Sequence, residues 1–162
     1  DGDLAYVLGV TRNEIGGSEY AGLLGIEGGN VPALDIGKAK EWYGRLSESI
    51  DRGLVASAFP VSLGGILIAL AKVSIDGLLG MDITIPEDMR PDLYLFSESL
   101  GRFVVTVAPA DREEFEAVIG QEAHLIGTVG GMVFRVRQGG RVLLETPVAV
   151  MDTAYKQPFR RY

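Results

Sequence analysis

Residues 57–77, SAFPVSLGGILIALAKVSIDG, constrain the fold more than any other stretch of the chain. The short apolar run Val55–Val61 predicts a strand, and the cluster Ser62–Gly65 predicts a turn. Ile66–Ile75 follows with apolar residues on nearly every side, and a helix of that composition has to be covered all round. Asp76-Gly77 predicts its end, with the glycine in the left-handed conformation. We therefore expect a strand, a tight turn and the most enclosed helix of the molecule.

The turn Ser62–Gly65 has two interpretations. The helix that follows it begins with free backbone N–H groups, which favour an anion such as phosphate. A tight strand-to-helix connection also needs glycine for steric reasons alone, and such connections are common. The residues of the turn do not by themselves decide between the two.

Composition narrows the class of protein. With 162 residues, of which 47% are apolar, the chain is expected to form a domain with a real core rather than a disordered segment. Its net charge of −7 argues against nucleic-acid binding and against anionic membranes, since both need basic surfaces. The absence of cysteine excludes disulfides and thiolate metal sites, and the single histidine, His124, excludes multi-histidine metal ligation.

The start of the chain is typical of a piece cut from a longer polypeptide, although trimming or disorder would give the same start. Asp1 lies close to the first predicted strand, and no signal peptide opens the sequence. No apolar run reaches the roughly 18 residues that a membrane span needs. We expect residues 1–162 to be one domain of a larger chain.

Seven segments have the apolar or alternating pattern of strands. They are Leu4–Val10, Val55–Val61, Met81–Ile85, Arg102–Ala108, His124–Val129, Met132–Arg137 and Val142–Pro147. Arg102–Ala108 has few polar atoms on either face, which is typical of a central strand. Gly130-Gly131 predicts a two-residue hairpin, and Gln138–Arg141 predicts a second turn. Arg135 and Arg137 point to one side, so their strand is expected to be half exposed.

Helices are predicted between the strands. Besides Ile66–Ile75, they cover Tyr20–Ile26, a segment from Asp35 to Gly53, Asp111–Ile119 and Ala149–Lys156. The Ser18 hydroxyl can cap the first of these, and Asp35 can cap the second. In the second of these, the predicted core stripe is Ile36, Ala39, Tyr43, Leu46 and Ile50. Trp42 lies off this stripe, either at its edge or in contact with a missing neighbour. In an interaction module, an exposed Trp42 and the aromatic rings of the tail Gln157–Tyr162 would make that contact. The elements together predict an α+β domain, a mixed sheet with helices packed on it.

No self-contained active site emerges from the sequence, so no catalytic or metal-binding residue is assigned. His124 heads an apolar strand and is expected to be a core or rim histidine, while Glu113, Glu114 and Glu116 fit a solvated helix face. Three turns remain, each beside a strand or helix end where backbone N–H groups can hold phosphate. They are Gly16-Gly17-Ser18, Ser62–Gly65 and Ser97–Arg102.

The order and spacing of these turns resemble a known family, the C-terminal domain shared by phosphoribosylformylglycinamidine synthase and aminoimidazole ribonucleotide synthetase. The matching stretches are Val7–Gly9, Glu14–Tyr20, Gly53–Ala58, Gly64–Ile66, Ala69–Ala71, Leu95–Val105 and Ile126–Val129. The likeness extends from about Leu4 to about Val148 and is greatest to the last such domain of the synthase's large, ATP-using subunit. The most specific motif positions are Glu19, Ser97, Glu98, Ser99 and Arg102.

The resemblance implies a reaction and its partners. Such a synthase converts formylglycinamide ribonucleotide to the amidine, using ATP, magnesium and ammonia derived from glutamine. It implies sister domains in the same chain, a glutaminase domain or subunit, a cytoplasmic location and the pairing of like domains, so that an isolated fragment is a candidate self-dimer. Most of the active site is built with ATP-binding domains outside this stretch, so the fragment is expected to be inactive and to hold neither ATP nor magnesium tightly.

Departures from the family pattern leave two interpretations open. The family usually has a His-Asp pair where this chain has Phe59-Pro60, often an acid at Leu63, and usually Gln at Leu100. The domain is then either chiefly structural in a divergent synthase, or it holds its ligand by backbone N–H groups alone. An alternative outside enzymology is a non-catalytic interaction module that docks onto sister domains.

Any surviving ligand contact is expected to be with phosphate. The candidate residues are Gly16, Gly17, Ser18, Ser62, Gly64 and Gly65. Glu19 opposes an anion at the first turn. The central turn is expected to be freer of charge, because Leu63 replaces the family's acid, and to bind phosphate weakly without a strong magnesium dependence.

Overall fold

The computed structural model describes residues 1–158, and in them seven strands form one mixed sheet in the order β2-β4-β1-β5-β3-β6-β7. The strands are β1 (Leu4–Leu8), β2 (Ser57–Pro60), β3 (Met81–Thr84), β4 (Phe103–Val107), β5 (Ala123–Val129), β6 (Val133–Gln138) and β7 (Arg141–Pro147). Neighbouring strands are antiparallel except β3 and β6, which are parallel. The predicted mixed sheet and all seven predicted strands are confirmed.

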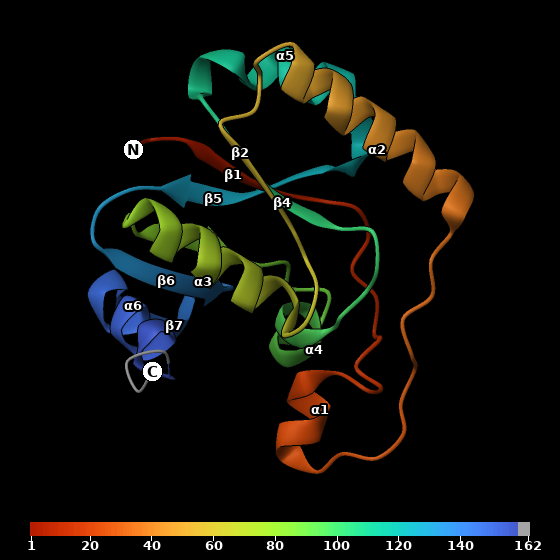
Figure 1. The fold of residues 1–162 in the computed structure, drawn as a ribbon, viewed down its shortest axis with the longest axis vertical. Helices are drawn as coiled ribbons and strands as arrows, with labels where there is room; N and C mark the ends of the chain where they lie inside the picture. Colours follow the sequence, from red (N-terminus) through yellow and green to blue (C-terminus); the bar gives the residue numbers. More distant parts are fainter. Residues whose placement is uncertain (159–162) are drawn as a thin grey trace.

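Helices lie on both faces of the sheet (Figure 1). They are α1 (Glu19–Leu24), α2 (Ile36–Asp51), α3 (Gly65–Gly77), α4 (Pro91–Phe96), α5 (Arg112–Ile119) and α6 (Val148–Lys156), with short 3₁₀ turns at Pro109–Asp111 and Gly120–Glu122. In the described part of the chain, none of them is both long enough and apolar enough to cross a lipid bilayer. The α+β class follows from this arrangement.

The two faces of the sheet have separate cores. On one face, Tyr6 and Val105 pack with Leu46 of α2 and Phe115 of α5. On the other face, α3 and α4 pack against a larger apolar cluster that reaches from β1 to β6. Because β1 and β4 are covered on both sides, Arg102–Ala108 is confirmed as part of an interior strand.

The predicted hairpin at Gly130-Gly131 is wrong. β3 lies between β5 and β6, with Met81 opposite Val129 on one side and opposite Phe134 on the other. An alternating pattern identifies a strand but not its partner, and here the insertion of β3 buries Met81 almost completely. The second predicted turn is confirmed: β6 and β7 form a hairpin in which Gly139 and Gly140 both have positive φ.

The buried face of α2 differs from the predicted stripe. Ile36 is 74% exposed and Tyr43 and Ile50 are also exposed, whereas Trp42 is only 7% exposed. The Trp42 indole donates a hydrogen bond to the Gly101 carbonyl at 3.0 Å, so the largest side chain of the helix obtains both burial and a partner. Of the two alternatives for Trp42, the structure supports a place at the buried edge of the helix and not exposure for a missing neighbour. Residues 159–162 of the predicted aromatic tail lie outside the described residues.

The central helix α3 is not buried all round. Ala69 and Leu70 are buried as predicted, but Ile68 is 38% exposed, so the expectation of burial all round is wrong for this chain. The sheet, α4 and α6 contact the helix, and its other apolar residues from Ile66 to Ile75 are buried or half-buried. Its left-handed cap is also displaced by one residue, from Gly77 to Leu78, where the Leu78 and Leu79 amides close the last turn onto Ser74 and Ile75.

Candidate functional site

The three turns singled out from the sequence meet in one place, which we call the junction. It consists of the segment Thr11–Glu19 after β1, the turn Ser62–Gly65 before α3, and the loop Ser97–Arg102 before β4. These segments are far apart in the chain, so long-range hydrogen bonds hold the junction together.

Two serines of the loop bind the backbone of the first segment. Ser97 Oγ accepts a hydrogen bond from the Glu14 amide at 3.3 Å, and Ser99 Oγ accepts one from the Arg12 amide at 3.1 Å. Between them, the Glu98 amide donates to the Glu14 carbonyl at 3.3 Å. Both serines are fully buried, so hydroxyls here satisfy backbone groups that water cannot reach.

Glu98 joins the other two turns. Its Oε1 accepts hydrogen bonds from the Gly64 amide at 2.8 Å and from the Glu19 amide at 3.0 Å. The carboxylate thus lies at the start of α3 and at the first residue of α1, where the N-terminal end of a helix favours negative charge. The expectation that the central turn is freer of charge than the first is wrong, because the Glu98 carboxylate binds the Gly64 amide as well as the Glu19 amide.

Arg102 is the buried cation of the junction. It is 1% exposed and donates to the carbonyl of Ser97 at 2.6 Å, to the carbonyl of Ser99 at 2.8 Å and to Thr11 Oγ1 at 3.0 Å. Burial lowers the pKa of Arg102 to about 10, against the opposing effect of Tyr94 and the carboxylates of Glu14 and Glu98. The guanidinium remains charged at neutral pH and fixes the shape of its own loop.

The first glycine turn is constrained by close backbone contacts. A Cβ at Gly16 would lie 2.6 Å from the carbonyl oxygen of Gly29, and the Gly16 amide donates to the Asn30 carbonyl. Ser18 caps α1 by accepting from the Ala21 amide at 3.1 Å, which confirms the predicted cap. These groups serve the local fold.

The central turn has the same character. Gly65 has a φ of +70°, and a Cβ there would lie 2.5 Å from the carbonyl oxygen of Leu95. Its amide donates to the Ser62 carbonyl, whereas the Ser62 hydroxyl is exposed and makes no hydrogen bond within residues 1–158. Glycine is therefore needed at position 65 for steric reasons, whatever the turn binds.

Sequence reasoning gave no role to Glu14, which the structure places inside the junction. Glu14 is 6% exposed; its Oε1 accepts from the Ala33 amide at 3.2 Å, and its Oε2 has no hydrogen-bond partner in the described residues. The only signal in the sequence was an acid two residues before the glycine turn. At the edge of the junction, Leu63 and Leu100 are exposed and give it an apolar border.

The chemistry available to the junction is limited. Its amide donors are mostly used internally, and residues 1–158 contain no group of three His, Cys, Asp or Glu side chains able to hold a metal ion. His124 lies at the exposed rim of a separate cavity, and Glu114 and Glu116 form ion pairs with Arg52 and Arg112 on the surface.

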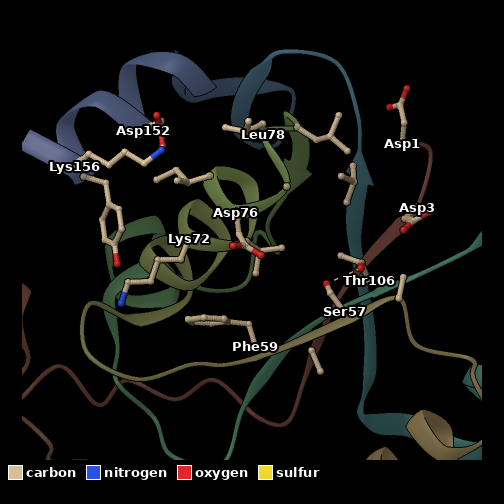
Figure 2. Close-up of a pocket in the computed structure, with 18 residues that line it drawn as sticks. Asp1, Asp3, Ser57, Phe59, Lys72, Asp76, Leu78, Thr106, Asp152 and Lys156 are labelled. Carbon is tan, nitrogen blue, oxygen red and sulfur yellow. Dashed lines mark hydrogen bonds and ion pairs between the residues drawn. The ribbon is translucent and has the colours of Figure 1, made fainter.

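A groove of about 760 Å³ lies away from the junction, between β2, α3 and α6 (Figure 2). Lys72 lies over the Phe59 ring at 5.9 Å, Ser57 and Thr106 share a hydrogen bond, and Lys156 pairs with Asp152. None of the predicted phosphate-binding residues lines this groove, so it is not the site that the sequence predicts.

Comparison with known proteins gives a consistent result across nearly the whole chain. The family model "AIR synthase related protein, C-terminal domain" matches residues 1–136. The PurL subunit of phosphoribosylformylglycinamidine synthase from Moorella thermoacetica is 37% identical over 161 residues, covering 97% of this chain and 22% of the relative. The PurL subunit from Methanocaldococcus jannaschii is 30% identical over 164 residues, covering 98% of this chain and 22% of the relative. The chain thus spans about a fifth of the length of these relatives.

Solved structures share the fold. T. maritima PurL complexed with FGAR superposes with a TM-score of 0.80 at 23% identity, covering 93% of this chain and 28% of that chain. The hydrogenase maturation protein HypE in complex with ATP gives a TM-score of 0.59 at 13% identity, covering 90% of this chain and 51% of that chain.

Proposed function

Because the chain belongs to the family of AIR synthase related proteins, as their C-terminal domain, we propose that it is the last domain of the ATP-using subunit of a phosphoribosylformylglycinamidine synthase. The observation that carries the proposal is the junction, where the three turns that resemble those of the family meet. There Glu98 accepts hydrogen bonds from the backbone of two of these turns. The proposed enzyme, a ligase of purine biosynthesis, converts formylglycinamide ribonucleotide to its amidine with ATP and ammonia.

Nucleotide and magnesium are proposed to bind mainly to parts of the enzyme outside this chain. T. maritima PurL has been solved complexed with ATP, which supports a nucleotide site in the intact protein. Any phosphate contact in this domain would use the Ser62 hydroxyl and the turns at Gly16–Ser18 and Gly64-Gly65. At Gly64 the phosphate would have to displace Glu98.

Exposed apolar side chains around the junction support docking onto sister domains. Leu23 is 83% exposed, Val31 is 70% exposed and Leu63 is 64% exposed, and α1 with the segment after it extends away from the sheet (Figure 1). Apolar surface of this extent is typical of a contact with another protein surface. A glutaminase partner is proposed because T. maritima PurL is also found in the PurLQS assembly.

The proposal is tested with the full-length protein. We expect ATP- and magnesium-dependent formation of the amidine from formylglycinamide ribonucleotide and ammonia, in a cytoplasmic enzyme, and no turnover by residues 1–162 alone. No turnover by a well-folded full-length protein would contradict the proposal, and amidine formation by the fragment alone would contradict its dependence on sister domains.

The second candidate is a non-catalytic interaction module. Phe59-Pro60, Leu63 and Leu100 replace polar family residues, and Leu63 and Leu100 are exposed at the junction. This candidate would be favoured by a full-length protein that is inactive although this domain still packs onto its sister domains. The isolated chain would then pair with itself through a free sheet edge, β2 or β7, and a monomer mass by light scattering at high concentration would contradict that pairing.

A further inference from the structure

A second cavity, of about 680 Å³, opens between the ends of β1 and β3, the start of β5 and helix α4. Its walls are apolar and include Ile85, Met89 and Ile126. The two turns proposed for phosphate, Gly16–Ser18 and Ser62–Gly65, contribute no residue to this cavity. The cavity also shares no residue with the groove in Figure 2. The volume falls in the range of about 300–1,000 Å³ that small-molecule sites have.

Tyr94 is the first indication that the cavity takes a ligand. Its side chain lines the cavity, it is 6% exposed, and its hydroxyl makes no hydrogen bond within residues 1–158. Burial raises the pKa of Tyr94 to about 12, so the hydroxyl is a donor at neutral pH. The hydroxyl is not among the fully buried unpartnered atoms of residues 1–158, so it opens into the cavity, where the acceptor of a ligand can take its hydrogen bond in place of water.

Thr11 adds a second donor beside a buried positive charge. Thr11 lines the cavity, and its Oγ1 accepts a hydrogen bond from Arg102 at 3.0 Å, which leaves its own proton available to a further acceptor. The charge of Arg102 also acts on Tyr94, and so, in the opposite direction, does that of Asp88. This part of the cavity is therefore suited to a negatively charged oxygen, such as that of a carboxylate.

The rim has the opposite character. Asp88 and His124 line the cavity and are exposed, and Asp88 forms no ion pair within the described chain. Asp88 would repel a simple anion but would attract an ammonium group. The cavity thus offers donors beside a cation, a free carboxylate at the rim, and apolar walls between them.

We propose that this cavity binds a free amino acid with an apolar side chain. Its carboxylate accepts hydrogen bonds from Tyr94 and Thr11, its ammonium pairs with Asp88, and its side chain packs against Ile85 and Met89. This site goes beyond the proposed synthase function and does not depend on it.

The test is a titration of the isotope-labelled protein with L-leucine, followed by backbone amide NMR. Two half-ligands serve as controls: 4-methylpentanoate, which lacks the ammonium group, and 3-methylbutylamine, which lacks the carboxylate. We expect leucine to shift the amides of Thr11, Thr84 and His124 and to bind about tenfold more tightly than either half-ligand.

Variants localise the binding. Tyr94→Phe should weaken leucine binding by about tenfold, while Tyr43→Phe, which lies outside the cavity, should leave it unchanged. Asp88→Asn should abolish the advantage of leucine over 4-methylpentanoate without affecting the fold. The absence of amide shifts at millimolar leucine would overturn the proposal, and so would equal affinity for leucine and for a half-ligand. Tight leucine binding by a folded Tyr94→Phe variant would also contradict it. Inorganic phosphate that shifts the same amides more strongly than leucine would show that the cavity is an anion site instead.

Discussion

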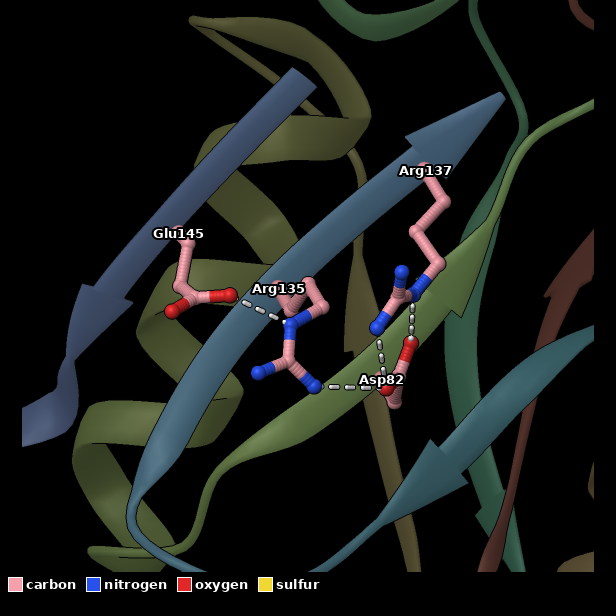
Figure 3. Close-up of polar contacts among 4 residues, drawn as sticks. All are labelled: Asp82, Arg135, Arg137 and Glu145. Carbon is pink, nitrogen blue, oxygen red and sulfur yellow. Dashed lines mark hydrogen bonds and ion pairs between the residues drawn. The ribbon is translucent and has the colours of Figure 1, made fainter. Parts of the chain in front are cut away.

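Two polar clusters of this molecule differ in how much water reaches them. In the junction, the Arg102 guanidinium is buried and bonded to backbone carbonyls and a hydroxyl. On the face of β3, β6 and β7 opposite α3, Asp82 bridges Arg135 and Arg137, and Arg135 also pairs with Glu145 (Figure 3). These four side chains remain partly exposed, with Asp82 at 44%. Similar groups are therefore placed in environments with very different dielectric screening.

Polar side chains contribute most to the stability of the fold where water cannot replace them. In the junction each lost side chain leaves buried backbone groups without partners, which is expensive. In the exposed cluster each lost charge is replaced by water, and such pairs contribute about 0–1 kcal/mol. Substitutions in the junction are therefore expected to lower the free energy of unfolding more than substitutions in the exposed cluster.

The largest effect is expected for Arg102→Leu. The change leaves two buried carbonyls and Thr11 without their donor and should lower the free energy of unfolding by about 3–5 kcal/mol. Urea unfolding followed by circular dichroism measures it. Arg102→Lys should be intermediate, because lysine keeps the charge but not the planar fork. If Arg102→Leu unfolds at the same urea concentration as the wild type, the two clusters do not differ in their contribution to stability.

Gly65→Ala should have the next largest effect. The new methyl would meet the Leu95 carbonyl at 2.5 Å in a left-handed backbone, and we expect a loss of about 3 kcal/mol. Gly17→Ala is the matched control, because Gly17 also has positive φ but has open space around its Cβ, and it should cost about 1 kcal/mol. Equal midpoints for the two variants would contradict the close packing of the central turn.

Glu98→Gln should cost about 1–2 kcal/mol. The amide oxygen can still accept hydrogen bonds, but the negative charge at the two helix starts is lost. Glu113→Gln, an exposed acid in the first turn of α5, is the control and should change stability by less than about 0.5 kcal/mol. If both variants unfold alike, Glu98 does not join the turns.

Asp82→Asn should have the smallest effect, at most about 1 kcal/mol. Hydrogen bonds from Arg137 and Arg135 hold the pKa of Asp82 below its ordinary value, against the opposing effect of burial. Its stabilising contribution is therefore present above the unfolded pKa and is lost as pH falls through the folded one. Unfolding midpoints of wild type and variant should converge as pH falls below the ordinary aspartate pKa, and also in high salt. A difference that grows on acidification would contradict this.

Local patterns were sufficient to predict most of the secondary structure, but not the short helix α4 (Pro91–Phe96). The seven strands, the Asp35 and Ser18 caps and the hairpin at Gly139-Gly140 depend on short-range spacing and were found from it. The wrong hairpin at Gly130-Gly131 depended on a distant strand, β3, that inserts between its neighbours. The burial of Trp42 likewise depended on an acceptor 59 residues away, at Gly101.

The site was predictable in its parts and not in its connections. The sequence and the family resemblance identified the turns that meet at the junction. They did not show that Glu98 occupies the Gly64 amide or that Glu14 is buried, because both contacts join segments far apart in the chain. Long-range hydrogen bonds leave no periodic signal in a single sequence.

The most direct test of the junction is hydrogen exchange at the amides of Gly64 and Glu19. Both donate to Glu98, so they should exchange slowly in the wild type and at least about tenfold faster in Glu98→Ala. The Gly17 amide, which makes no hydrogen bond in the described chain, should exchange fast in both proteins. Fast exchange of Gly64 and Glu19 in the wild type, at the rate of Gly17, would contradict a junction held by Glu98.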